Sequence, residues 1–132
     1  MFSVVRSEQR ALRRRRAVRT LYGQHRFHRT PAGRAQRLLQ QWLTPAQWKQ
    51  FCSRGYFDVI GSHSARRYRI YRGTAMNVCL LDERGRVRRG LCFVPIYDLP
   101  AGDVMLAQKL ALELCEDSAL MVAREFIPRA LY

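Results

Sequence analysis

The fold is decided by residues 56–71, YFDVIGSHSARRYRIY, where the hydrophobic pattern changes from a helical period to a period of two. Residues 56–60 predict one strand and residues 67–71 predict a second, joined by a polar loop. The alternation in the second strand places Tyr68 and Ile70 on one face and Arg67, Arg69 and Tyr71 on the other. The stretch therefore predicts antiparallel strands with one buried and one exposed face.

The sequence after this stretch continues the sheet and then returns to a helical pattern. Residues 76–81 and 90–94 are apolar on both faces and predict two further, covered strands. The intervening turn at 82–86 favours a hairpin, whose register decides whether Cys79 and Cys92 share a face. Residues 101–115 are apolar nearly all round and predict a helix buried against the sheet, followed by a last helix from Asp117 or Ser118 to about Phe126.

The sequence before this stretch is helical. Thr44, Pro45 and Gln47 have the pattern of a capping box, and Gly55 is expected to end that helix. Thr30 and Pro31 predict the start of a preceding helix. We expect the first of these helices in the chain to bury Leu38, Leu39, Trp42 and Leu43, and the second to bury Trp48, Phe51 and Cys52.

The start of the chain predicts a separate basic arm. Residues 4–22 fit an amphipathic helix, Gly23 is expected to stop it, and residues 23–30 are expected to form a basic loop. The predicted fold class is therefore α+β: a basic N-terminal helix, a helix pair, a four-stranded antiparallel β-meander and two C-terminal helices packed on the sheet. The predicted division is an arginine-rich arm over residues 1–30 and a single domain over residues 31–132.

Positive charge is concentrated at the start of the chain. The net charge is +14, and residues 6–37 contain eleven arginines and one acid, Glu8. Residues 98–132 carry six acids and three basic residues, so that end is mildly acidic. The 22 arginines against two lysines favour phosphate recognition, because guanidinium groups bind phosphate in a bidentate way, although coding bias in a GC-rich genome explains the ratio equally well.

We therefore hypothesise a non-enzymatic protein that binds DNA or RNA through mainly phosphate contacts of low sequence specificity. Its predicted contact residues are Arg13, Arg14, Arg15, Arg16 and Arg19 in the arm, and Arg67, Arg69 and Tyr71 on the sheet face. An aromatic ring between guanidinium groups suits single-stranded nucleic acid, but the same face also fits an ordinary solvated sheet. The alternative is a structural subunit whose arm docks on an acidic protein face in a nucleoprotein or phage assembly, and an anionic membrane surface is a third partner.

Other functional classes have little support in the sequence. No phosphate-cradling glycine loop, metalloprotease motif or paired carboxylates occur, so we predict no catalytic residues, no metal and no cofactor. The four cysteines are expected to be buried thiols, and the acids near residues 103–117 are interpreted as helix caps and solubilising groups. No apolar stretch is long enough for a membrane span, and we expect a bacterial cytoplasmic protein, with a mitochondrial presequence as the alternative reading of the N-terminus.

Several segments together resemble a known group of proteins. The stretch YFDVIGSHSARRYRIYRGTAMNV, followed by LDERGR, LCFVP and LPAGDVMLAQKLALEL, is similar to an uncharacterised family of small proteins from GC-rich bacteria. The likeness covers roughly residues 36–126 and leaves out the arginine-rich arm. It implies a bacterial or mobile-element origin and a single domain, and it implies no activity.

Overall fold

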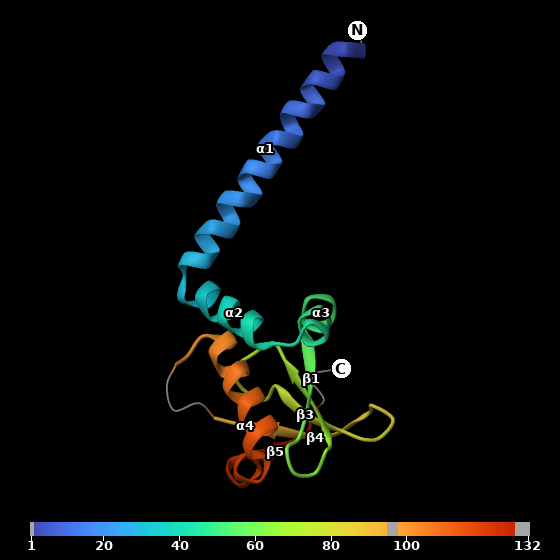
Figure 1. The fold of residues 1–132 in the computed structure, drawn as a ribbon, viewed down its shortest axis with the longest axis vertical. Coiled ribbons are helices and arrows are strands. Elements are labelled where there is room, and N and C mark those ends of the chain that lie inside the picture. The colour runs from blue at the N-terminus through green and yellow to red at the C-terminus, as the bar shows by residue number, and fades with distance from the viewer. Residues whose placement is uncertain (1, 95–97, 129–132) are drawn as a thin grey trace. The chain divides into compact units, whose positions relative to one another are not determined.

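The structure is a computed structural model that describes residues 2–94 and 98–128 of the 132-residue chain, apart from the side chains of residues 2–6 and 17–25. Over these residues the chain is α+β, with four helices and five strands (Figure 1). Its contacts divide it into two compact units, Met1–Arg34 and Ala35–Tyr132. The predicted boundary, between residues 30 and 31, lies four residues earlier.

The first unit consists of α1 (Phe2–Arg29) and the start of α2 (Pro31–Trp42). The predicted stop at Gly23 and the predicted loop at 23–30 are wrong, because α1 continues through both. A glycine inside a helix costs only about 1 kcal/mol, which the surrounding good helix formers offset. The Thr30 hydroxyl accepts a hydrogen bond from the Gly33 amide at 3.0 Å, so Thr30 caps α2 as predicted.

The second unit is built on an antiparallel five-stranded meander in the order β1-β2-β3-β4-β5. The strands are β1 (Tyr56–Ile60), β2 (Arg67–Tyr71), β3 (Val78–Leu81), β4 (Val87–Cys92) and β5 (Arg124–Phe126). The first four confirm the predicted meander, although β4 begins three residues before the predicted strand. The prediction of four strands is wrong, because the chain returns after the last helix and pairs Arg124–Phe126 with β4.

The helix α3 (Pro45–Arg54) begins and ends as predicted. Thr44 and Gln47 form both hydrogen bonds of the capping box, and Gly55 takes a left-handed conformation with φ 76°. The helix buries Phe51, whose ring meets that of Phe57 on β1 at 5.9 Å. The predicted burial of Cys52 is wrong, and Trp48 is only half-buried.

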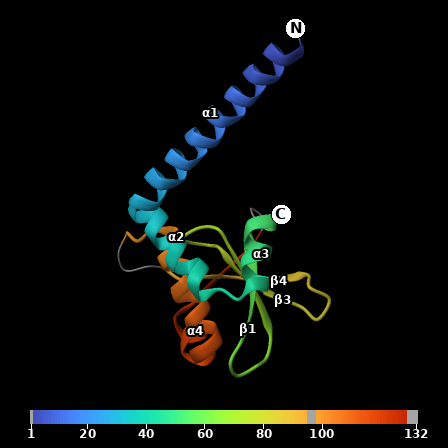
Figure 2. The ribbon, with the colours of Figure 1, turned by 45° about the horizontal axis from the view of Figure 1, so that its top comes forward.

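The helix α4 (Ala101–Val122) covers the inner face of the sheet, and the views from two directions agree on this layering (Figures 1 and 2). Its residue Leu112 is fully buried, together with Val59 and Ile70 of the sheet. The helix is less buried than predicted, since Leu114 is 70% exposed. The side chains of Ala35 and Leu39 on α2, and of Leu43 directly after it, face inward, because they repeat every four residues.

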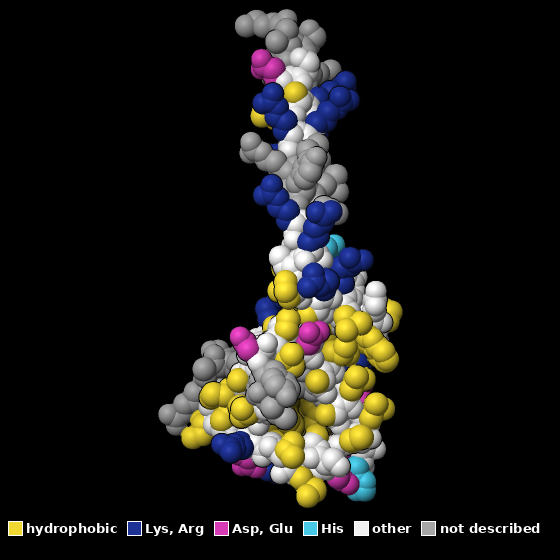
Figure 3. Space-filling view, turned by 90° about the vertical axis from the view of Figure 1, so that its left-hand side faces the viewer, with side chains coloured by type: hydrophobic (Ala, Val, Ile, Leu, Met, Phe, Trp, Pro, Cys, Tyr) yellow, Lys and Arg dark blue, Asp and Glu magenta, His cyan; other side chains and the backbone are white. Residues whose placement is uncertain are grey.

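The predictions that Leu38 and Trp42 are buried are therefore wrong. Each lies one position before an inward-facing residue, about 100° away around the helix, and both are exposed. Hydrophobic side chains gather visibly on one face of the second unit (Figure 3).

The backbone of α4 breaks at Cys115, where φ is −141° and ψ is 49°. The predicted boundary between two C-terminal helices is thus present as a kink, but the second segment ends at Val122, short of the predicted Phe126. The β1–β2 loop stabilises the kink. The Ser62 amide donates to the Leu112 carbonyl oxygen at 3.0 Å, and the Glu116 amide donates to the Ser62 hydroxyl at 3.1 Å.

The Glu116 side chain is the centre of this contact and is 1% exposed. Its carboxylate accepts hydrogen bonds from the amides of His63 and Ser64 and from the hydroxyls of Ser64 and Tyr68. Burial by itself raises the pKa of Glu116, but these hydrogen bonds outweigh burial and lower the pKa to about 2. A Cβ at Gly61 would lie 2.3 Å from the carboxylate, so the loop requires glycine there. The interpretation of Glu116 as a helix cap or a solubilising group is therefore wrong.

Candidate nucleic-acid interface

The described arginines of the arm are all exposed. They include the four consecutive residues Arg13, Arg14, Arg15 and Arg16, whereas the side chain of Arg19 lies outside the described residues. Glu8 is the one acidic side chain in residues 1–34, and no ion pair joins it to Arg13, Arg14 or Arg15. Ten arginines and this glutamate give the first unit a net charge of +9.

The charge of α1 surrounds the helix. Consecutive residues of an α-helix are separated by about 100°, so four adjacent arginines cover most of its circumference. Figure 3 shows basic side chains on more than one side of α1. Over the whole of Phe2–Arg29 the apolar residues do not keep to one face. The predicted amphipathic pattern covers only residues 4–22, and most of its apolar side chains lie outside the described residues, so it stays a prediction.

The sheet brings the second predicted set of residues together. Arg67, Arg69 and Tyr71 lie on the outer face of β2, opposite Ile60, Asp58 and Tyr56 of β1. Asp58 neutralises Arg69 through two hydrogen bonds, 2.8 Å from Nε and 3.2 Å from Nη2, with both side chains 17% exposed. A nitrogen of Arg67 lies 3.9 Å from the same carboxylate. This face therefore carries less net charge than its arginines suggest.

The tyrosines of this face also contact their neighbours. The rings of Tyr56 and Tyr71 meet edge to face at 5.2 Å, and the Arg69 guanidinium lies 4.0 Å above the Tyr56 ring. Burial raises the pKa of Tyr71, with a hydrogen bond from Arg69 acting in the opposite direction. The ring of Tyr71 is half-buried, so a base would reach it only in part.

The sequence reasoning missed Asp58. The signal was available, because Asp58 alternates onto the outer face of residues 56–60 and a short loop fixes the pairing of Ile60 with Arg67. That register places Asp58 directly opposite Arg69. An aspartate and an arginine on neighbouring strands of one face attract each other.

The thiols do not form a recognisable catalytic arrangement. Cys52 and Cys115 are exposed, contrary to prediction, whereas Cys79 is buried. Cys79 pairs with Gly90, so Cys92 lies on the same outer face. Burial raises the pKa of Cys79 to about 11, which leaves little reactive thiolate at neutral pH.

Two features are absent from the part of the chain that the structure describes. Nowhere there do three His, Cys, Asp or Glu side chains gather as ligands for a metal ion. None of the helices in this part has the length and apolar character needed to cross a bilayer.

Comparison of the chain with protein-family models, characterised proteins and solved structures finds no significant match. The resemblance to small proteins from GC-rich bacteria stays a prediction.

Proposed function

We propose that the protein is a non-enzymatic nucleic-acid-binding protein whose helix α1 contacts the phosphate backbone. The observation that carries the proposal is the run of exposed arginines at 13–16, in a unit of net charge +9 with a single carboxylate side chain. Such a cluster attracts a polyanion and releases its condensed counterions on binding.

The distribution of charge around α1 favours nucleic acid over the other anionic partners. A helix that lies on a membrane buries an apolar face in the lipid, whereas the exposed arginines at 13–16 place charge on several sides of α1 within about one turn. An acidic protein face would contact one side of the helix only. The major groove of DNA admits an α-helix and has phosphates along both edges, so it meets arginines on several sides.

The sheet face makes an auxiliary contact in this proposal. Arg67 is 46% exposed and lies on the same face of β2 as Tyr71. Arg69 contributes less, because Asp58 already satisfies its guanidinium group. We therefore place most of the binding free energy on α1.

A salt titration tests the proposal. The affinity of the full chain for a short DNA duplex and a single-stranded RNA is measured by fluorescence anisotropy from about 50 to about 300 mM salt. The arm-Gln variant replaces each of Arg13, Arg14, Arg15 and Arg16 with glutamine, and the matched arm-Lys variant replaces each with lysine. We expect steep salt dependence for the wild type and the arm-Lys variant, and a slope reduced by about three to four for the arm-Gln variant.

Two results would contradict the proposal. One is no binding at about 50 mM salt, or an affinity that salt barely changes. The other is equal competition by polyglutamate of the same net charge, which would favour docking on an acidic protein.

A further inference from the structure

An open cavity of about 370 Å³ lies beside the β3–β4 hairpin. Its polar lining includes the four arginines Arg66, Arg84, Arg86 and Arg88 and the two acids Asp82 and Glu83. The lining therefore carries an excess of two positive charges. A cavity of this size matches the lower end of the range for small-molecule sites.

The hairpin turn uses Asp82 for its own structure. The Asp82 carboxylate accepts hydrogen bonds from the amides of Arg84 and Arg86, each at 2.9 Å, and from Arg86 Nε at 3.2 Å. These bonds lower the pKa of Asp82, mainly through the amide of Arg86. Asp82 and Arg86 thus neutralise each other within the turn, which leaves three arginines and one acid, Glu83, in the lining.

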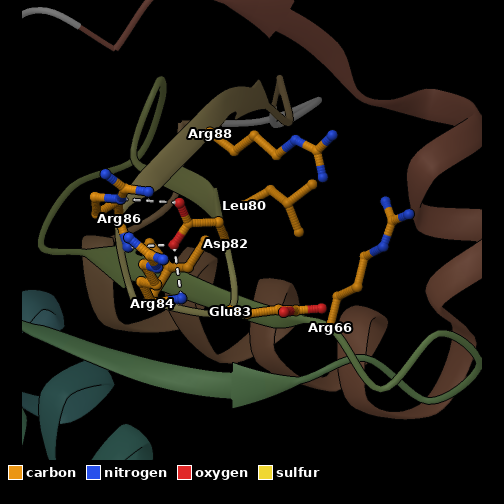
Figure 4. Close-up of a pocket in the computed structure, with 8 residues that line it drawn as sticks. Arg66, Leu80, Asp82, Glu83, Arg84, Arg86 and Arg88 are labelled. Carbon is orange, nitrogen blue, oxygen red and sulfur yellow. Dashed lines mark hydrogen bonds and ion pairs between the residues drawn. The ribbon is translucent and has the colours of Figure 1, made fainter.

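Two of these guanidinium groups face the same hollow. Arg66 precedes β2 and Arg88 lies on β4, and Figure 4 shows their side chains extending toward one open space, with Leu80 between them. Both are exposed, and neither forms an ion pair with any described residue. Two converging guanidinium groups beside an aliphatic wall suit a phosphate group that carries an organic substituent.

The remaining acid opposes such a ligand. Figure 4 shows the Glu83 carboxylate near Arg66, at the edge of the same space, and no ion pair joins these two described residues. A like charge at the rim weakens the binding of an anion, so its removal should strengthen binding. Removal of Glu83 should therefore strengthen anion binding, whereas removal of an arginine should weaken it. A purely structural role for these residues does not predict opposite effects on affinity.

We propose that this cavity binds a phosphomonoester, supplied by a free nucleotide or by the 5′-phosphate end of a nucleic acid. A terminal phosphate carries up to two negative charges, which matches the excess of two positive charges in the lining, whereas an internal phosphodiester carries one. Arg66 and Arg88 bind the phosphate oxygens, and Leu80 contacts the attached group. None of the lining residues belongs to the arm, so the site can be tested with the arm arginines replaced.

The test uses the full-length arm-Gln variant, so that α1 cannot mask the result. Adenosine 5′-monophosphate, with adenosine as the phosphate-free control, is titrated into ¹⁵N-labelled protein and followed by NMR. We expect shifts at residues 80–88, affinity at least about tenfold weaker after Arg66→Gln with Arg88→Gln, and affinity severalfold tighter after Glu83→Gln. The matched control is Arg54→Gln, an exposed arginine on α3, which should leave binding unchanged.

A second arm of the experiment compares the same oligonucleotide with a 5′-phosphate and with a 5′-hydroxyl. If the 5′-phosphorylated oligonucleotide binds more tightly than adenosine 5′-monophosphate, the source of the phosphate is a nucleic-acid end. If the mononucleotide binds more tightly, the source is a free nucleotide. Equal binding of adenosine and its monophosphate, or shifts that persist in the Arg66→Gln and Arg88→Gln double variant, would overturn the site. Either result leaves the salt titration of α1 unaffected, so the two proposals fail separately.

Discussion

The arginines of α1 and those of the sheet unit differ in what surrounds them. Arg69, Arg86 and Arg89 each pair with a carboxylate close by, at 2.8, 3.2 and 2.6 Å. Arg13, Arg14 and Arg15 have no such partner among the described residues. These arginines of the sheet unit therefore form ion pairs within the fold, whereas those of α1 keep their charge available for a partner.

Composition explains the difference. Residues 35–132 contain nine acids for fourteen basic residues, whereas residues 1–34 contain one acid for ten arginines. The strands also place acids opposite arginines, as Asp58 faces Arg69. An isolated helix has no opposing strand and can neutralise its charges only through its own next turns.

The largest expected effect on stability is that of Glu116→Ala, which removes a buried carboxylate of the sheet unit. The change leaves the amides of His63 and Ser64 and the Tyr68 hydroxyl without their acceptor. We expect the free energy of unfolding to fall by about 3–5 kcal/mol, measured by urea denaturation. The control is Glu125→Ala, which removes an exposed ion pair and should cost about 1 kcal/mol or less. Equal losses for the two variants would show that the buried carboxylate has no special role.

The same carboxylate makes stability depend on pH. Its pKa is lowered from 4.5 to about 2 in the folded state, so its contribution is complete above pH 4.5 and is lost as the pH falls through 2. We expect thermal stability to drop steeply over this interval in the wild type and less steeply in Glu116→Gln. Parallel curves for the two proteins would contradict the assignment.

A core substitution compares packing along α4. Leu112 is fully buried, whereas Leu110 is only partly buried against the core. We expect Leu112→Ala to lower the free energy of unfolding by about 2–5 kcal/mol and Leu110→Ala by about 1–2 kcal/mol, measured by urea denaturation. A larger loss at Leu110 would mean that the inner face of α4 is misassigned.

Asp58→Asn sharpens the comparison by giving the sheet an arginine like those of the arm. Arg69 loses its neutralising partner, so we expect the free energy of unfolding to fall by about 1–2 kcal/mol. The freed charge should steepen the salt slope of nucleic-acid binding by about one at most. If Asp58→Asn lowers the free energy of unfolding as expected but makes the salt dependence of binding shallower, the outer face of β2 is not part of the interface.

The smallest effect on stability is expected in the arm. The arm-Gln variant removes exposed charges that repel one another and should change the free energy of unfolding by less than about 0.5 kcal/mol. Circular dichroism would check that the helix content is retained. A large loss of stability would mean that α1 is a packing element of the fold.

Local signals account for what the sequence predicted well. The capping box at Thr44 and Gln47, the stop at Gly55 and the alternation of β1 and β2 are fixed by neighbouring residues. The failures come from tertiary contacts. The segment at 124–126 becomes a strand because β4 offers an unpaired edge, and the Phe126 ring covers Gly90 where a side chain would collide with it.

The sequence predicted which residues share the outer face of β2, but it did not predict the net charge of that face. The sequence indicated that Arg67, Arg69 and Tyr71 share a face, and they do. It did not indicate that Asp58 neutralises Arg69, or that Arg66 and Arg88 meet at one cavity. The convergence of Arg66 and Arg88 depends on the register of the β3–β4 hairpin and on its irregularity between Leu80 and Leu81, because these decide where side chains from different strands point.

The central claim is that arginine charge is available in α1, whereas it is already neutralised at Arg69, Arg86 and Arg89 of the sheet unit. Its most direct test is the salt slope of binding to one DNA duplex, measured for the arm-Gln variant and for a triple variant with Arg69→Gln, Arg86→Gln and Arg89→Gln. We predict that the arm-Gln variant loses about three to four units of slope and the triple variant at most about one. Equal losses of slope, or a larger loss in the triple variant, would contradict the claim.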